Sequence, residues 1–386
     1  MPERRNEKDG PLARTRLSRR EFNTVCQVAL VPAIWPWTAL SGIIDGAVAY
    51  LQRVGQSGDS QSCGQAGAGV TALMTTAILR SGRSVHDPVV AKSLKSLESF
   101  VQPDGGIYSP GGMLANYETC LAIVCLGEAN SDKRYDRLLR PAEAFVRKFQ
   151  WDENMGKDPS DLSYGGAGYG KHKRPDLSNT AFLLDALRSC GAGADDPAVQ
   201  KALVFVSRCQ NFESPHNTAP FAAKNPDGGF YYTCAAGGVS PAGNTSNGGL
   251  HSYGSMTYSG LKSMIYAGVQ ADDPRVKAAL AWLRKNYDLK NNPGLGNAGL
   301  YYYYQVCAKA LRALGGEVFE DAAGEKHDWQ RELAAEIIGR QKENGSWVNE
   351  NNRWMEGDPA LVTAYALLTL SYCQPAAEKA VPRHSA

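Results

Sequence analysis

Three carboxylic acids stand at the starts of apolar, helix-forming segments, where a carboxyl group could act as an acid. Glu118 lies in "NYETC", Asp176 opens "DLSNTAFLLDAL" and Asp358 lies in "EGDPALVTA". A carboxyl group that points into a desolvated cavity has a raised pKa and can donate a proton near neutral pH. The alternative is that each acid caps the free N–H groups of its helix, because Asp, Ser and Asn are favoured there.

Tyrosines gather around the same helix starts and could line a cavity for an apolar or sugar-like ligand. Packing between helices is the alternative for each of them. The four consecutive tyrosines of "GLYYYYQVC" cannot all face one way on a helix, so we expect about half of them to face inward. The candidate ligand-binding residues are Tyr117, His251, Tyr253, Tyr258, Tyr301, Tyr303 and Tyr304, and Tyr164, Tyr169, Tyr231 and Tyr232 lie in matching loops.

A basic run, "GKHKRPD", precedes the segment that Asp176 opens. Lys171 and Arg174 could hold a diphosphate or another anion at the mouth of the cavity. A solvated loop is the alternative, because most short charge runs face water.

Composition excludes several classes of function. The chain has 386 residues, of which 43% are hydrophobic and 21% charged, so it can form a large packed core. The formal net charge of +2 gives no general attraction for nucleic acid, and we expect no such partner. No segment outside the N-terminal region has the roughly 18 uninterrupted apolar residues of a membrane-spanning helix.

Residues 1–42 differ from the rest of the chain. The segment "SRREF" at 18–22 resembles a twin-arginine export signal, and a short apolar run follows it. This pattern predicts export to the periplasm or cell envelope. The alternative is a basic, disordered tail on a cytoplasmic protein, because Pro32 and Pro36 interrupt the run. Residues 376–386 are expected to form a C-terminal tail.

Two kinds of helix alternate between residues 43 and 375. One kind is apolar nearly all round, which indicates burial on both sides. The other kind has a polar face and often opens with Asp-Pro, a helix-start signal. The apolar segments begin at Thr71, Thr119, Thr180, Thr257, Gln305 and Thr363. The amphipathic segments include 43–52, 87–102, 140–150, 196–210, 273–287 and 328–341. Six pairs of this kind predict an all-α fold, an (α/α)6 toroid with an outer amphipathic ring and an inner apolar ring.

A spaced motif accompanies the helix pairs. Gln102 and Gln341 are each followed four residues later by a glycine and two residues after that by an aromatic residue, and "NPDGGFYY" (225–232) is related to this motif. The glutamine can bind loose backbone groups at the end of an outer helix, the glycine permits a turn, and the ring packs over the helix end. The motif is therefore expected to tie an outer helix to the following inner helix.

The Gln-x3-Gly-x-Trp spacing resembles the repeat signature of the squalene–hopene cyclases, and the toroid is shared with protein prenyltransferase β subunits. The resemblance implies an apolar cavity in which the middle acid of Asp-x-Asp-Asp-Thr-Ala protonates a polyene. Asp176 matches the first aspartate, whereas Ser178 and Asn179 replace the next two. A serine cannot donate this proton, so the resemblance implies a cyclase-like protein with a non-standard acid.

Other toroid relatives fit less well. The prenyltransferases hold zinc with an Asp-x-Cys pair, which does not occur here, and His251 with Cys307 supplies too few ligands. No metal or cofactor is therefore expected. Thioester proteins need a glutamine three residues after the cysteine, but Ala66 stands there after Cys63.

Two functions follow from these patterns. The first is an enzyme related to the terpene cyclases that acts on an isoprenoid or similar apolar substrate. The second is a non-catalytic toroid that binds a ligand or protein partner in its aromatic-lined lumen. Contact with a membrane surface is compatible with either function.

Overall fold

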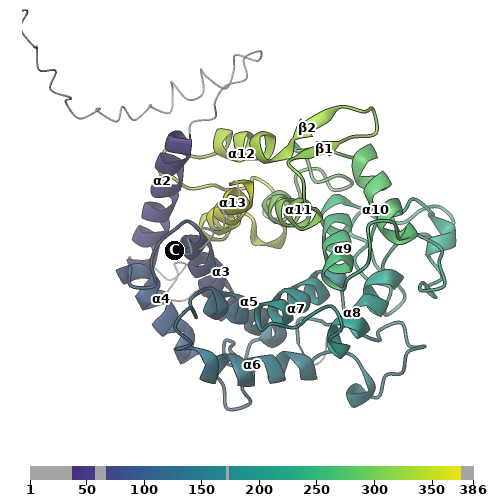
Figure 1. Cartoon of the computed structure of the whole chain (residues 1–386), viewed down its shortest axis with the longest axis horizontal. Coiled ribbons are helices and arrows are strands. Elements are labelled where there is room, and N and C mark those ends of the chain that lie inside the picture. Colours follow the sequence, from purple (N-terminus) through teal and green to yellow (C-terminus); the bar gives the residue numbers. More distant parts are fainter. Residues whose placement is uncertain (1–36, 57–66, 171–173, 375–386) are drawn as a thin grey trace, which may run out of the picture.

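Two concentric rings of helices make up the part of the chain that the structure describes, a computed structural model of residues 37–56, 67–170 and 174–374 (Figure 1). The outer helices are α2 (Trp37–Gln56), α4 (Pro88–Ser99), α6 (Asp136–Lys148), α8 (Pro197–Arg208), α10 (Pro274–Lys285) and α12 (Trp329–Gly339). The inner helices are α3 (Ala68–Arg80), α5 (Ala115–Glu128), α7 (Leu177–Ser189), α9 (Gly254–Tyr266), α11 (Leu300–Leu314) and α13 (Pro359–Cys373). The predicted (α/α)6 toroid is confirmed.

The chain closes on itself. Each inner helix contacts the next one in sequence order, and α13 contacts both α3 and α2. Because outer and inner helices alternate, the inner helices all run in one direction and their N-termini share one end of the lumen, the space that they encircle. No helix among the described residues has the length and apolar character to cross a bilayer.

Some predictions fall at or beyond the limits of the described residues. The predicted leader up to residue 36, Cys63, Lys171 and the tail from residue 376 lie outside them. The predicted boundary at residue 43 falls inside α2, which begins at Trp37.

Short elements fill the connections. An antiparallel pair that the sequence did not predict, β1 (Val318–Glu320) and β2 (Lys326–Asp328), joins α11 to α12. The 3₁₀ turns η1 (Glu153–Met155), η2 (Ala222–Lys224) and η3 (Arg353–Met355) lie in loops that lead to inner helices.

The Asp-Pro openings act as the sequence predicts. Asp87, Asp196 and Asp273 are the N-caps of α4, α8 and α10, and each carboxylate accepts the backbone N–H two residues on, with proline in the first turn. These caps fix where each outer helix begins.

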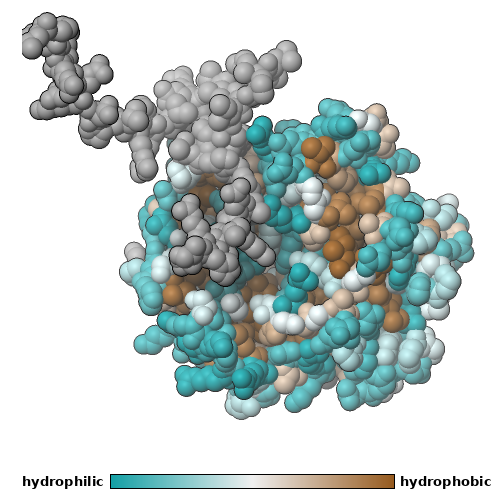
Figure 2. Space-filling view, viewed as in Figure 1, coloured by the Kyte–Doolittle hydropathy of each residue, from teal (hydrophilic) through white to brown (hydrophobic). Residues whose placement is uncertain are grey.

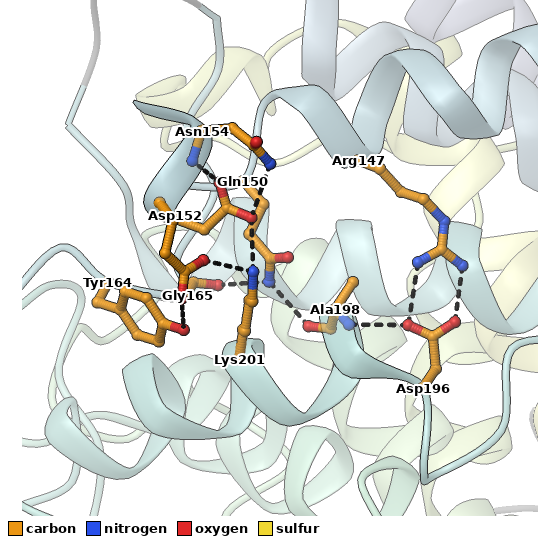
Figure 3. A network of polar contacts seen from close by, with 10 residues as sticks. Arg147, Gln150, Asp152, Asn154, Tyr164, Gly165, Asp196, Ala198 and Lys201 are labelled. Atoms are coloured by element: carbon orange, nitrogen blue, oxygen red, sulfur yellow. Dashed lines mark hydrogen bonds and ion pairs between the residues drawn. The ribbon is translucent and has the colours of Figure 1, made fainter. Parts of the chain in front are cut away.

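A glutamine at the end of an outer helix ties one helix pair to the next. The Gln150 side-chain amide donates to the carbonyl of Gly165, at 2.9 Å, and to that of Ala198 in the first turn of α8, at 2.8 Å (Figure 3). Gln210 makes the same two bonds, to Gly228 and to Arg275 in α10. The predicted backbone bonds are present, and those of Gln150 and Gln210 also reach the next outer helix. Gln102 instead donates to the carbonyls of Phe100 and Tyr108 in its own turn, both at 3.0 Å.

The same device closes the ring. Gln341, after α12, donates to Gly345 and to the carbonyl of Ile43 in α2, both at 3.0 Å. Gly345 has φ +89°, and a Cβ there would lie 2.3 Å from the carbonyl oxygen of Gly46. Trp347 packs below this turn and donates its indole N–H to the Ile337 carbonyl at 2.7 Å. The last helix pair is thus fastened to the first.

Threonines hold the inner helices to these turns. The backbone N–H groups of Ile107, Ala167, Phe230 and Trp347, one or two residues after the motif glycine, donate to Thr119, Thr180, Thr257 and Thr363 respectively, at 3.0 to 3.1 Å. Each threonine therefore faces its outer helix. At about 100° per residue, positions two before and two, five and nine after it face the lumen.

The ring closure gives a direct test. Gly345→Ala should lower the free energy of unfolding by at least about 3 kcal/mol, because the methyl group meets the α2 backbone and the residue keeps a left-handed conformation. Gly82 has nearly the same φ, +88°, with open space around it, so Gly82→Ala is the matched control and should cost about 1 kcal/mol. Urea unfolding of both variants measures the difference, and equal losses would contradict the closure.

Candidate functional site

Side chains from four inner helices meet across the lumen near its N-terminal end. Ser178 of α7 and Tyr302 of α11, which are not neighbouring helices, share a hydrogen bond of 2.9 Å. Tyr117 of α5 hydrogen-bonds Tyr365 of α13. These bonds show that the lumen is narrow at this level.

An aromatic belt, defined here as Tyr117, Phe182, Tyr302 and Tyr365, surrounds this point. Phe182 lies edge-on to Tyr117, with centroids 5.1 Å apart, and 6.3 Å from Tyr302. The Tyr302 and Tyr365 rings are 6.0 Å apart. Such rings present negative π-faces, which attract cations.

The belt borders a hollow. Several residues of the ring interior are only half-buried, although helices surround them on all sides, so part of their surface faces an open space. They are Tyr117, Tyr169, Ser178, Phe182, Tyr232 and Tyr302. In Figure 2 the visible face has a hydrophilic rim, with apolar side chains gathered inward over α9, α11 and the strand pair.

Asp176 is a buried acid at the edge of this hollow. It is the N-cap of α7, is 2% exposed, and accepts the backbone N–H and the side-chain amide of Asn179, both at 2.8 Å. Burial raises the pKa of its carboxyl group to about 6, and hydrogen bonds from Asn179 and Tyr232 and the charge of Arg174 offset only part of that rise. The group is therefore both a cap and an acid that changes protonation near neutral pH.

The side chain of Asn179 has a hydrogen-bond acceptor without a donor. Its side chain is 1% exposed, and its Oδ1 atom has no hydrogen-bond partner among the described residues. Its amide N–H donates to Asp176 and also interacts with the Tyr169 hydroxyl, beside the hollow. A buried orphan acceptor of this kind marks a place for a donor such as a ligand hydroxyl or water.

The structure gives Glu118 and Asp358 capping positions. Glu118 accepts the backbone N–H of Gly69 at 3.4 Å and that of Ser109 at 2.8 Å, so it binds the start of α3. Asp358 is the N-cap of α13 and accepts the Ala360 N–H at 2.8 Å. Neither carboxylate belongs to the aromatic belt, and the capping alternative accounts for both.

Several candidate tyrosines lie in helix packing. Tyr303 and Tyr304 are fully buried and donate their hydroxyls to the carbonyls of Asp288 and Leu289. Tyr301 stacks edge-on with Tyr304, and Tyr258 packs against Tyr303. The packing alternative accounts for these four residues, whereas Tyr302 is the member of the quartet that faces the lumen.

The remaining candidates stand at or just before the starts of α7 and α9. Tyr253 is 3% exposed at the N-cap of α9, and burial followed by the charges of Tyr302 and Asp176 raises its pKa. The Arg174 guanidinium lies 6.0 Å from the Tyr232 ring centroid and is exposed, as is His251.

Sequence reasoning missed Phe182, Tyr365 and Glu356. Phe182 and Tyr365 each stand two residues after a threonine that holds its inner helix to the preceding turn, Thr180 and Thr363 respectively. That spacing is the signal that could have identified them. Glu356, 1% exposed, accepts the Tyr302 N–H at 2.8 Å and so caps α11, and burial raises its pKa. It lies outside the apolar helices, and no spacing pointed to it.

One group of metal-ligand types occurs among the described residues. Asp321, Glu325 and His327 lie together on the strand pair, with ligand atoms within 4.8 Å of one another. Asp321 already accepts the Ala323 and Glu325 N–H groups, and His327 contacts Glu332 at 3.1 Å. These contacts give the cluster a structural role in the turn, apart from the lumen.

Comparisons with known proteins give similarities of fold at low sequence identity. No protein-family model matches the chain, and no curated protein does. Among solved structures, the apo type II terpene cyclase MstE from Scytonema is 15% identical, with 86% of this chain and 97% of that chain covered and a TM-score of 0.47. A variant of that cyclase in complex with geranylgeranyl dihydroxybenzoate (substrate) has the same identity and coverage, with a TM-score of 0.48. The glycoside hydrolase family 76 mannosidase Bt3792 from Bacteroides thetaiotaomicron is 13% identical, with 85% and 98% covered and a TM-score of 0.48.

The titration of Asp176 can be measured directly. Carbon-13 NMR of aspartate-labelled protein should show one carboxyl group with a midpoint near pH 6, because burial disfavours its charged form. That signal should be missing in Asp176→Asn, which assigns it. A spectrum in which every aspartate titrates below about pH 4.5 would contradict the environment described here.

Proposed function

We propose that the hollow binds an apolar, isoprenoid-type substrate and that Asp176 starts its reaction as a general acid. The observation that carries the proposal is a carboxyl group with a pKa of about 6 that hydrogen-bonds Tyr232 beside an aromatic-lined space. A general acid works best when its pKa lies near the operating pH. The choice of an isoprenoid follows the sequence resemblance to the squalene–hopene cyclases.

The proposed step is proton addition to a carbon–carbon double bond. The Asp176 O–H bond breaks, the π electrons of the substrate form the new C–H bond, and a positive charge develops on the other carbon. The faces of Tyr117, Phe182, Tyr302 and Tyr365 stabilise that charge. Attack by a second double bond closes a ring, and loss of a proton from an adjacent carbon returns one proton to solvent or to Asp176. The reaction is an isomerisation and needs no cofactor.

Ser178 and Asn179 take different roles in this proposal. Ser178 stands where the related cyclases have their protonating aspartate, and its hydroxyl is bonded to Tyr302. It therefore positions the belt and leaves the acid to Asp176. Asn179 orients the Asp176 carboxyl group through its side-chain amide at 2.8 Å.

Substrate entry is proposed at the N-terminal end of the inner helices. Met113 and Leu114 in the loop before α5, and Trp354 and Met355 in the loop before α13, are large apolar side chains that stay exposed. Trp354 and Met355 also have positive φ values, 56° and 66°, a strained geometry that is common at functional sites. Contact of this rim with a membrane surface would bring apolar molecules to the mouth.

The acid can be removed without removing the cap. Asp176→Asn keeps a side-chain oxygen for the Asn179 N–H, because asparagine is an equally good N-cap, but it cannot donate the proton. We expect product formation from squalene, farnesol or geranylgeraniol to fall by at least about 100-fold. Asp358→Asn makes the same change at another N-cap and should leave turnover unchanged. Extraction and mass spectrometry of the products measure both.

The pH profile gives a second readout on the wild-type protein. A general acid acts in its protonated form, so the rate should be constant below the pKa of about 6 and fall about tenfold per pH unit above it. If Asp176→Asn were as active as wild type, Asp176 would not be the acid. If every substrate bound saturably without giving a product, the non-catalytic binding toroid would replace the proposal.

A further inference from the structure

Three charged side chains face one another inside the lumen, beyond the aromatic belt. Asp185 of α7 contacts Lys262 of α9 through one carboxylate oxygen and Lys309 of α11 through the other, both at 2.7 Å. The exposed fractions of the Asp185, Lys262 and Lys309 side chains are 7%, 3% and 12%. We call these residues the lumen triad.

The lumen triad has one positive charge more than it has negative charges. Its single carboxylate is shared by two ammonium groups, and no other ion pair of Lys262 or Lys309 occurs in the described chain. Nearby, Arg80 pairs with Glu128 and hydrogen-bonds Tyr372, and Arg188 lies 4.5 Å from the Tyr266 ring centroid. Lys262 also donates to the Ala181 carbonyl at 3.4 Å and lies 5.3 Å from the Tyr266 ring centroid, but neither contact supplies a full negative charge. A buried positive charge without its own counter-ion is unfavourable, and an added anion would stabilise it.

The pKa of Lys262 also reflects the excess positive charge of the lumen triad. Burial lowers its pKa to about 8, Asp185 offsets part of that effect, and the Lys309 charge lowers it further. Burial, the largest single effect, would lower the pKa of Lys309, but Asp185, Tyr372 and Tyr266 together outweigh it and raise that pKa. A second anion beside the two ammonium groups would let both remain charged.

Helix dipoles do not account for the two lysines. Basic residues in a last helical turn offset the partial negative charge there, and Arg80, Arg188 and Arg312 stand in such turns. Lys262 lies four residues before Tyr266, the end of α9, and Lys309 lies five residues before Leu314, the end of α11. Both are a full turn or more inside their helices, where the dipole effect has declined.

We propose that the lumen triad binds the anionic head group, a carboxylate or phosphate, of the molecule whose apolar chain occupies the lumen. This assignment deepens the proposed function and rests on it. Asp185 and Asp176 are nine residues apart along α7, about 13 Å at 1.5 Å per residue. A molecule held by its head at Lys309 would therefore present a double bond some 13 Å away to Asp176. The substrate class is an anionic isoprenoid.

Ligands that differ only in the head group, or that lack the chain, show how much each part contributes to binding. Farnesoic acid and farnesyl phosphate carry the anion on the same chain as farnesol, and inorganic phosphate carries it without a chain. We expect both anionic isoprenoids to bind at least tenfold more tightly than farnesol in calorimetric titrations. Binding of phosphate alone at similar strength would identify a small-anion site and overturn the assignment to an isoprenoid head.

Two variants change the charge balance in opposite directions. Lys309→Met leaves Asp185 and Lys262 as a one-to-one pair, so the protein should stay folded and lose the preference for the acid over the alcohol. Lys277, an exposed lysine of α10, gives the control Lys277→Met, which should keep the preference. Asp185→Asn leaves two lysines without a carboxylate, and farnesoic acid should raise its melting temperature more than that of wild type.

Binding should also depend on pH through Lys262. The charged or titratable groups around it are Asp185, Arg188, Tyr266, Lys309, Arg80 and Tyr372. An added anion favours protonated Lys262, so farnesoic acid should take up protons on binding and lose affinity above about pH 8. Titrations in two buffers of different ionisation enthalpy measure the uptake.

The outcomes distinguish the two proposals. Equal affinity for farnesol and farnesoic acid, unchanged in Lys309→Met, would overturn the anion assignment and leave Asp176 chemistry intact. Tight, Lys309-dependent binding of the acid without any product, unaffected by Asp176→Asn, would support the anion site and contradict the acid.

Discussion

The hydrogen bonds of one glutamine amide hold three of the helix pairs to the next pair, and the closure of the ring depends on the last of these bonds. Gln150, Gln210 and Gln341 each donate to a carbonyl of their own turn and to a carbonyl of the following outer helix, which lies in the first turn for Gln150 and Gln210 and further along α2 for Gln341. The last of these bonds, to Ile43, spans almost the whole chain and closes the circle. Because the partners are buried, breaking a bond leaves an unsatisfied carbonyl, which makes the closure specific as well as stabilising.

Closure of the ring makes the inner helices parallel, and this determines where the acidic side chains of the lumen lie. With the N-termini together, free N–H groups gather at one end, and Glu118, Asp176, Glu356 and Asp358 cap them. Asp176 and Glu356 both have a pKa raised by burial, but Asp176 hydrogen-bonds the Tyr232 side chain at the hollow, whereas Glu356 is held by the Tyr302 backbone N–H and the Asn349 amide. The need to cap α7 therefore places the carboxyl group of Asp176 beside the hollow, where the proposed reaction needs an acid.

The architecture was predictable from the sequence, because alternation of apolar and amphipathic helices and the Gln-x3-Gly-x-aromatic spacing both follow from local physics. The hydrogen bonds of Gln150 were not predicted, because an insertion separates this glutamine from Gly165. The strand pair was not predicted, because its strands are only three residues long. Within the site, the tyrosine quartet was located but its inward member was not, since one residue of register turns a side chain by about 100°. Lys262 and Lys309 carried a readable signal as charged residues inside apolar helices, but their shared partner, Asp185, required coordinates.

The central claim is that the closed ring holds an apolar ligand against the aromatic belt within reach of Asp176. A crystal structure of the protein soaked with farnesoic acid tests it most directly. The account predicts density for the chain against the aromatic belt, with a double bond within contact distance of the Asp176 carboxyl group. A lumen filled by its own side chains at that level, with ligand bound only on the outer surface, would contradict it.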